Sequence, residues 1–143
     1  MIFWDKLKTF NTLYEKLTEP VREQYKLTQM EFDIIMFLYN NPQYNTAGDM
    51  VHIRHLTKSH VSTSVASLEG KGLIRKISSA GSRKNIRLEL TDNSAEIVTA
   101  GANVQGAFGN ILIKGFSEED KNKFEELFLR ICANADAQLN RRK

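Results

Sequence analysis

The chain has 143 residues, a formal net charge of +3, and 41% hydrophobic and 26% charged residues, which suits one globular domain with a packed core. Its longest apolar run, residues 34–39, is far shorter than the roughly 20 residues of a membrane span, and residues 1–25 lack a small-residue cleavage site. The single cysteine, Cys132, excludes an internal disulfide and a cysteine-based zinc site. We therefore expect a cytoplasmic protein that forms one domain over residues 1–143.

The first predicted element is a helix with an apolar residue at every third or fourth position. These residues are Phe3, Leu7, Phe10, Tyr14, Leu17 and Val21. Such a seam packs against another helix, either in the same chain or in a second copy. Pro20 is expected to kink or end this helix near its last turn.

Two further helices are predicted between residues 28 and 56. Thr28 and Glu31 have the spacing of a capping box at the start of the first, which Asn-Asn-Pro at 40–42 stops. Thr46 and Asp49 form a second box. The helix that follows places three apolar residues on one face: Met50, Ile53 and Leu56.

The next helix has an unusual outer face. In residues 57–76, TKSHVSTSVASLEGKGLIRK, the apolar Val61, Val65 and Leu68 return at helical spacing. The positions between them are mediocre helix formers: Thr57, Lys58, Ser59, His60, Ser62 and Thr63. Short donors suit a helix that lies against base edges and phosphates, so we interpret this segment as a recognition helix. A merely polar, solvated face is the alternative.

After Gly72, which suits a left-handed helix end, the apolar period changes to two. Residues 73–78 and 85–90 are predicted to be two strands of an antiparallel hairpin, with Arg83 and Lys84 at the turn. Three consecutive helices followed by a basic hairpin predict a winged helix-turn-helix.

Two more helices are predicted after Thr91. The first carries Ile97, Val98, Val104, Phe108, Ile111 and Leu112, and its glycines at 101, 106 and 109 are expected to let another backbone approach. Ser117 and Asp120 cap the last helix. Its apolar seam consists of Phe124, Leu127, Phe128, Ile131, Ala135 and Leu139. The expected fold class is therefore mainly α with a small β-hairpin wing.

The positive charge is concentrated in one block. Residues 54–87 hold eight basic residues against Glu69, a net +7, while both flanking segments are mildly acidic. This distribution indicates a phosphate-binding surface between flanks that do not bind polyanions. Arg83 and Lys84 would extend beyond the turn toward a minor groove, whose negative potential attracts arginine most.

The stretch from Leu27 to Thr91 resembles the MarR family of bacterial regulators. The resemblance rests on LTQMEFDIIMFL, on LTKSHVSTSVASLEGKGLIRKI and on the closing IRLELT, and the flanking helices agree in number and length. The family usually has an aspartate, any residue and an arginine in the wing before the Leu-Thr pair, where this chain has Ser82, Arg83 and Lys84. Without the aspartate, either Arg83 takes over the insertion or the wing is more mobile.

The resemblance implies a homodimer that binds a pseudo-palindromic operator, mostly as a repressor released by small aromatic ligands, metals or oxidants. The DNA-binding lobe would be residues 27–91, and residues 1–26 and 92–143 would be dimerisation helices. The expected DNA contacts are Arg54, Thr57, Lys58, Ser59, His60, Ser62, Thr63, Arg75, Arg83 and Lys84. The expected dimer contacts are Phe3, Leu7, Phe10, Phe124, Phe128, Ile131 and Leu139.

The sequence says less about an effector. The family's peroxide-sensing branch uses a cysteine near the start of the chain, where this chain has none, and Cys132 is expected to be a buried structural thiol. His52 and His55 with Asp49 are a weak candidate for metal, so neither a metal nor a cofactor is expected. An aromatic cleft lined by Tyr14, Phe37 or Phe108 and ordinary core packing explain those aromatic residues equally well.

Two rival classes of function remain. An enzyme would need a nucleophile with a base, paired carboxylates or a phosphate-binding glycine loop, and the sequence has none of these. A winged helix used as a protein-interaction adaptor would use the same +7 block to bind an acidic partner.

Overall fold

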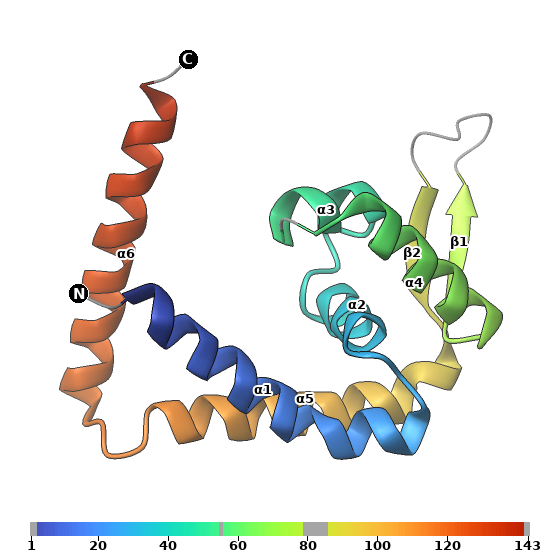
Figure 1. Cartoon of the computed structure of the whole chain (residues 1–143), viewed down its shortest axis with the longest axis horizontal. Coiled ribbons are helices and arrows are strands. Elements are labelled where there is room, and N and C mark those ends of the chain that lie inside the picture. Colours follow the sequence, from blue (N-terminus) through green and yellow to red (C-terminus); the bar gives the residue numbers. More distant parts are fainter. Residues whose placement is uncertain (1–2, 55, 79–85, 142–143) are drawn as a thin grey trace. The chain divides into compact units, whose positions relative to one another are not determined.

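The computed structural model describes residues 3–54, 56–78 and 86–141 (Figure 1). Its helices are α1 (Phe3–Tyr25), α2 (Gln29–Asn40), α3 (Ala47–Arg54), α4 (Lys58–Gly70), α5 (Ala95–Leu112) and α6 (Glu118–Asn140). Its strands are β1 (Ile74–Ser78) and β2 (Ile86–Leu90), and a 3-10 turn over Asp92–Ser94 precedes α5. The chain forms two compact units, one up to Phe108 and one from Gly109 onward. The predicted class, mainly α with one hairpin, is confirmed.

Three predicted capping boxes are present. The Thr28 backbone N–H donates to Glu31 Oε1 at 2.9 Å, and the Glu31 N–H donates to Thr28 Oγ1 at 3.1 Å. Thr46 with Asp49, and Ser117 with Asp120, form the same reciprocal pair of bonds. Each box satisfies amide groups that a helix start leaves without partners, which is why α2, α3 and α6 begin where they do.

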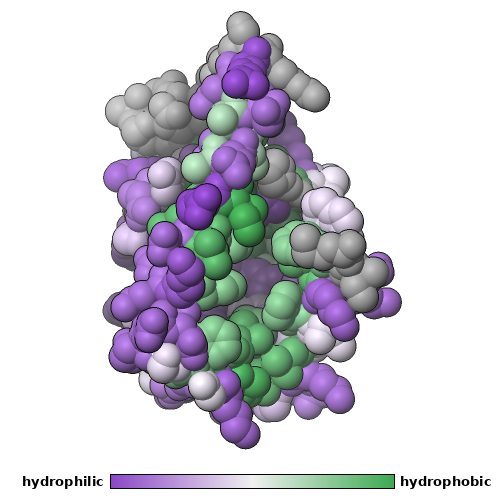
Figure 2. All heavy atoms as spheres, turned by 90° about the vertical axis from the view of Figure 1, so that its left-hand side faces the viewer, coloured by the Kyte–Doolittle hydropathy of each residue, from purple (hydrophilic) through white to green (hydrophobic). Residues whose placement is uncertain are grey.

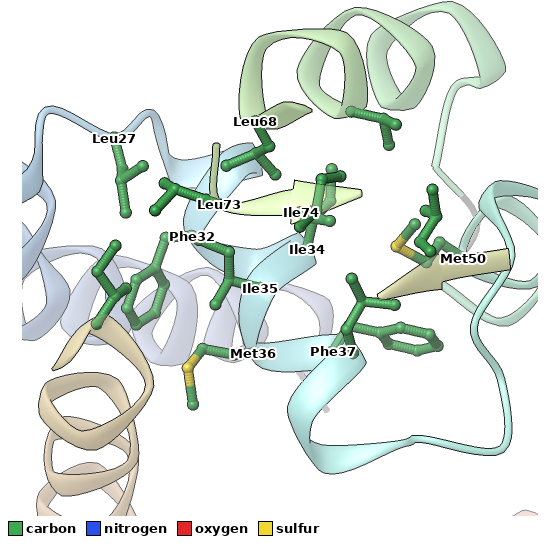
Figure 3. Close-up of a cluster of buried hydrophobic side chains, with 14 of the residues drawn as sticks. Leu27, Phe32, Ile34, Ile35, Met36, Phe37, Met50, Leu68, Leu73 and Ile74 are labelled. Carbon is green, nitrogen blue, oxygen red and sulfur yellow. The ribbon is translucent and has the colours of Figure 1, made fainter. Parts of the chain in front are cut away.

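Helix α2 is the centre of the core. It packs against α1, α4 and β2, so it is apolar on nearly all sides. Its buried side chains are Glu31, Phe32, Ile34, Ile35, Met36, Phe37 and Leu38. Figure 3 shows Ile34 of this helix together with Leu68 of α4 and Ile74 of β1. This shared core fixes α4 and the hairpin on one scaffold.

The hairpin begins directly after α4. Gly72 has a φ of +74°, the left-handed conformation expected for it, and this turns the chain from helix into strand. The strands are antiparallel with Ile74 opposite Leu90 and Ser78 opposite Ile86. The Leu88 N–H also donates to the Asn45 carbonyl at 2.7 Å, which joins β2 to the segment before α3.

Two expectations need correction, and a third is narrowed. Of the two effects expected of Pro20, it does not end α1, which continues to Tyr25. Ile53 does not share the buried face of Met50 but is 40% exposed. Gly101 makes room for side chains and not for a backbone: a Cβ there would lie 2.5 Å from Met36 Sδ and 3.1 Å from Phe32 Cε2.

Candidate nucleic-acid interface

Helix α4 separates an inner apolar face from an outer polar one. Val61, Val65 and Leu68 are buried in the core. The side chains of Lys58, Ser59, His60, Ser62 and Thr63 are exposed. The orientation predicted for the outer face is therefore the one in the structure. These short side chains let a flat partner approach the helix backbone closely.

The start of α4 leaves backbone N–H groups available as hydrogen-bond donors. Thr57 is the N-cap with extended backbone, but its side chain makes no capping hydrogen bond to the described residues. The backbone N–H groups of the first turn therefore have no side-chain partner there. Free N–H groups at a helix start favour the binding of an anion such as phosphate. Thr63 differs, because its hydroxyl donates to the Ser59 carbonyl at 2.9 Å. Thr63 Oγ1 is left to act as an acceptor.

A buried carboxylate holds α4 against α2. Glu31, only 3% exposed, uses Oε1 for its capping box and accepts with Oε2 from Ser67 Oγ at 2.8 Å and Lys71 Nζ at 2.9 Å. Lys71 Nζ also donates to the Lys26 carbonyl at 2.8 Å. Burial raises the pKa of Glu31, but the hydrogen bonds from Lys71, Thr28 and Ser67 outweigh it and hold the pKa below its ordinary value.

Sequence reasoning missed this clamp. The Thr28 and Glu31 spacing identified the cap, but the second oxygen of Glu31 meets residues 36 and 40 positions further along the chain. The sequence counts Lys71 in the positive block of residues 54–87. Only the packing of α2 on α4 shows that its charge is paired with Glu31.

The positive block is partly neutralised. Its ion pairs within the described residues are Lys71 with Glu31 at 2.9 Å, Arg75 with Glu89 at 2.6 Å and Lys76 with Glu69 at 3.8 Å. Hydrogen bonding and charge from Glu89 raise the pKa of Arg75. Arg75 is exposed on β1, so its predicted DNA contact would compete with Glu89. Arg87, which lies opposite Ile77 and is exposed, is a further candidate that the sequence prediction did not include.

The described residues do not include the predicted tip of the wing. Arg83 and Lys84, with Ser82, lie outside the described residues. Their predicted insertion into a minor groove stays a prediction.

Arg54 lies at the end of α3, and its guanidinium carbon is 5.3 Å from the centre of the Phe37 ring. It also lines a cavity of about 470 Å³ inside the unit that ends at Phe108. Tyr14, Phe37 and Phe108, the three residues predicted for an aromatic cleft, all line this cavity. Arg54 stays a predicted DNA contact, but in this structure its guanidinium lies over the Phe37 ring.

The residues predicted for dimerisation are exposed. Phe3, Leu7 and Phe10 of α1 are open, and on α6 the rings of Phe124 and Phe128 stack with centroids 5.8 Å apart. Ile131 and Leu139 are exposed as well. Figure 2 shows apolar residues, in green, lying open on the surface. Open apolar surface of this kind marks an interaction site.

The other predicted groups give no site. Cys132 is partly exposed, so the expectation of a buried thiol is wrong for the single chain. His52 is exposed on α3, His55 lies outside the described residues, and nowhere in the described ranges do three metal-ligating groups gather. Within the same ranges, every helix is too short or too polar to cross a membrane.

A helix-turn-helix with a hairpin, between long flanking helices, defines a winged helix-turn-helix protein. A model of the MarR family matches residues 25–84. The transcriptional regulator PecS of Dickeya dadantii is 23% identical over 133 residues, which are 92% of this chain and 80% of that protein. This chain is therefore similar to the MarR family over its winged helix-turn-helix region. PecS, to which the chain is similar, is a transcriptional regulator and not an enzyme.

Solved structures share the fold over nearly the whole chain. A MarR family regulator from Listeria monocytogenes, complexed with a 26mer DNA, has a TM-score of 0.78 and 20% identity, covering 97% of this chain and 92% of that one. Staphylococcus aureus MarR, in complex with salicylate and kanamycin, has a TM-score of 0.72 and 21% identity, covering 90% and 87%.

Proposed function

We propose that this protein is a sequence-specific, double-stranded DNA-binding transcriptional regulator that acts as a homodimer. The observation that carries the proposal is the outer face of α4, where Lys58, Ser59, His60 and Ser62 stand free of the core. A core shared with α2 and the Glu31 clamp hold this helix rigidly, as base readout requires. The DNA complex of the Listeria relative supports the same use of the fold.

In the proposed dimer, residues 1–26 and 92–143 pair the two chains, and residues 27–91 read DNA. The exposed apolar residues of α1 and α6 support this division. Two copies of α4 would enter successive major grooves with half-sites about 10 base pairs, or roughly 34 Å, apart. A protein that works on DNA in this way belongs in the bacterial cytoplasm.

We further propose that the regulator is a repressor that responds to a small molecule. The cavity of about 470 Å³ beside α3 has the size of a small-molecule site. The salicylate and kanamycin complex of the S. aureus relative supports an effector for this fold. Occupation of the cavity would act on α3, the helix directly before α4.

The first test selects bound genomic fragments from the organism's own DNA and then compares the selected site with random DNA. His60→Ala and Ser62→Ala should each weaken binding to the selected site by about 1–3 kcal/mol and change binding to random DNA little. His52→Ala, an exposed histidine on α3, is the matched control. Equal losses on both DNAs would demote His60 and Ser62 to phosphate contacts.

The protein-interaction adaptor remains a second candidate, because three cations of the basic block are already paired with carboxylates. Salt dependence separates the two. For DNA binding, log affinity falls against log salt with a slope near −0.9 per phosphate contacted, and Arg83→Ala should reduce that slope by about one unit. A flat salt dependence without preference among promoter fragments would favour the adaptor.

A further inference from the structure

The turn that follows α1 contains a strained residue. Lys26 has a φ of +54°, and among the described residues it is the one non-glycine with a positive φ. Side chains avoid this left-handed conformation, which glycine usually adopts at the end of a helix. A lysine keeps it only where the surrounding structure holds the turn in place. The contacts of this turn therefore indicate what the strain is used for.

The Lys26 carbonyl accepts a hydrogen bond from a residue far along the chain. Lys71, the C-cap of α4, donates from Nζ to this oxygen at 2.8 Å. Two backbone bonds fix the same turn: the Lys26 N–H donates to the Glu23 carbonyl at 3.3 Å, and the Leu27 N–H donates to the Arg22 carbonyl at 2.8 Å. The left-handed turn therefore presents a carbonyl from the end of α1 to the end of α4.

The same ammonium is also bonded to the start of α2. Lys71 Nζ donates to Glu31 Oε2 at 2.9 Å, and Ser67 Oγ donates to the same oxygen at 2.8 Å. Glu31 is buried, so its carboxylate has little freedom to move. A carbonyl at a helix C-terminus and a carboxylate both favour a cation. One ammonium thus joins the end of α1, the start of α2 and the end of α4.

This ammonium links α1 and α4 more specifically than packing does. Helix α2 packs against both helices, but among the described residues no second hydrogen bond joins α1 or Lys26 to α4 or Lys71. Packed helices can slide slightly past one another, whereas a hydrogen bond between an ammonium and a carbonyl holds only over a narrow distance. Lys71 therefore fixes the end of α4 relative to the end of α1.

The position of α4 relative to α1 matters for DNA reading. This step rests on the proposed function, in which α1 pairs the two chains and α4 reads the bases. The separation of the two α4 helices must then match the spacing of the two half-sites. Slack between α1 and α4 in each chain would widen the range of separations that the dimer adopts.

We propose that Lys71 is a positioning residue for operator spacing: its bonds to the Lys26 carbonyl and to Glu31 set the separation of the two α4 helices in the homodimer. Lys71 acts through α4 and makes no contact with DNA. It differs in this from the exposed Lys58 of α4, whose charge is open to phosphate. Loss of the Lys71 ammonium relaxes the choice of spacing and leaves the electrostatic part of DNA binding unchanged.

The test compares the selected DNA site with the same site carrying one extra base pair between its half-sites. Fluorescence anisotropy titration should show that wild-type protein prefers the selected spacing by roughly tenfold or more. Lys71→Met should reduce this preference to about threefold or less. The slope of log affinity against log salt should stay the same, because no phosphate contact is lost. A wild type without spacing preference, an unchanged preference in Lys71→Met, or a slope reduced by about one unit overturns the proposal.

Two further variants separate positioning from misfolding and from charge. Lys71→Met leaves the buried Glu31 carboxylate without its partner, so the double variant with Glu31→Gln removes both charges together. It should relax the spacing preference as the single variant does. Lys76→Met, the matched control, removes an exposed lysine of β1 that lies 3.8 Å from Glu69, and it should keep the preference. Thermal unfolding checks that each variant folds. A double variant with the wild-type preference, or a control that loses it, overturns the proposal.

Amide hydrogen exchange in the free protein gives a readout without DNA. The amides of residues 22–28 should exchange at least about threefold faster in Lys71→Met, because the turn at Lys26 loses its support, and at the wild-type rate in Lys76→Met. If the chain selects no DNA but this exchange depends on Lys71, the proposed function fails and the link between α1 and α4 stands. If the chain selects DNA and Lys71→Met keeps the spacing preference, the positioning role alone fails.

Discussion

Helices α2 and α6 carry similar apolar seams but meet different surroundings. Of the 12 residues of α2, seven are buried, whereas none of the 23 residues of α6 is buried within the chain. The apolar side chains of α6 are 42–65% exposed, namely Phe124, Leu127, Phe128, Leu129, Ile131 and Leu139. An apolar seam therefore indicates that a helix needs a partner, and it does not say in which chain the partner lies.

Helix α1 shows both situations in one element. Thr18 and Val21 in its second half are buried, and Val21 belongs to the core cluster. Phe3, Leu7 and Phe10 in its first half are exposed although they continue the same spacing. The change along α1 marks where the core of the chain ends and where the surface proposed for the second copy begins.

The largest effect is expected in the α2 core. Phe32 is fully buried against Gly101 of α5. Phe32→Ala should lower the free energy of unfolding by about 3–5 kcal/mol, because it removes buried apolar surface and leaves a cavity. Urea unfolding followed by circular dichroism measures the loss. A loss below about 1 kcal/mol would mean that α2 is not the centre of the core.

On α6 we expect an effect on association instead. Replacing Phe124 and Phe128, the stacked exposed pair, by serine should weaken the homodimer by about 2–4 kcal/mol, since buried aromatic side chains dominate interfaces. Light scattering and sedimentation across a concentration series measure this. Wild-type protein that stays a single chain at working concentration would refute the dimer, and an unchanged dimer in the variant would remove α6 from its interface.

Two ion pairs that differ in burial can be compared: Glu31 with Lys71, whose carboxylate is buried, and Glu69 with Lys76, which is exposed. Glu31→Gln should cost about 2 kcal/mol of unfolding free energy, less than a fully buried pair, because Lys71 is 35% exposed. Glu69→Gln, which breaks the longer and exposed contact with Lys76, should cost under about 0.5 kcal/mol. Equal losses would show that burial does not distinguish the two pairs.

Acid titration gives the Glu31 pair a second readout. Because the folded pKa of Glu31 lies below its ordinary value, the pair stabilises the fold fully above the ordinary glutamate pKa. This contribution is lost as the pH falls through the lower folded pKa. The stability difference between wild type and Glu31→Gln should therefore be constant near neutral pH and shrink on acidification. A constant difference into strong acid would contradict the ionised clamp.

The smallest effects compare two glycines of α5. Gly101→Ala should destabilise by about 1–2 kcal/mol, because its Cβ would lie 2.5 Å from Met36 Sδ. Gly106→Ala has open space around it and should stabilise by about 0.5–1 kcal/mol through helix propensity. Thermal unfolding compares the pair. A stabilising Gly101→Ala would show that the contact between α5 and α2 is loose.

The sequence by itself determined the elements and most of their ends, although not the end of α1. The box of Thr28 with Glu31, the turn at Gly72 and the pairing of the two strands each depend on groups a few residues apart or on the apolar period. It also determined that the polar face of α4 points outward, because Val61, Val65 and Leu68 have one direction in which to be buried.

Only the tertiary structure decided which distant groups meet. Lys71 bonds to Glu31, which lies 40 positions earlier in the chain, Met36 packs where Gly101 has no Cβ, and the guanidinium of Arg54 lies over the Phe37 ring. The same holds for Asp33, which no sequence motif singles out and which lines one cavity together with Tyr14 and Phe108. Residue spacing encodes contacts within one helix or hairpin, whereas contacts between elements depend on how close-packed side chains fit, which no single segment specifies.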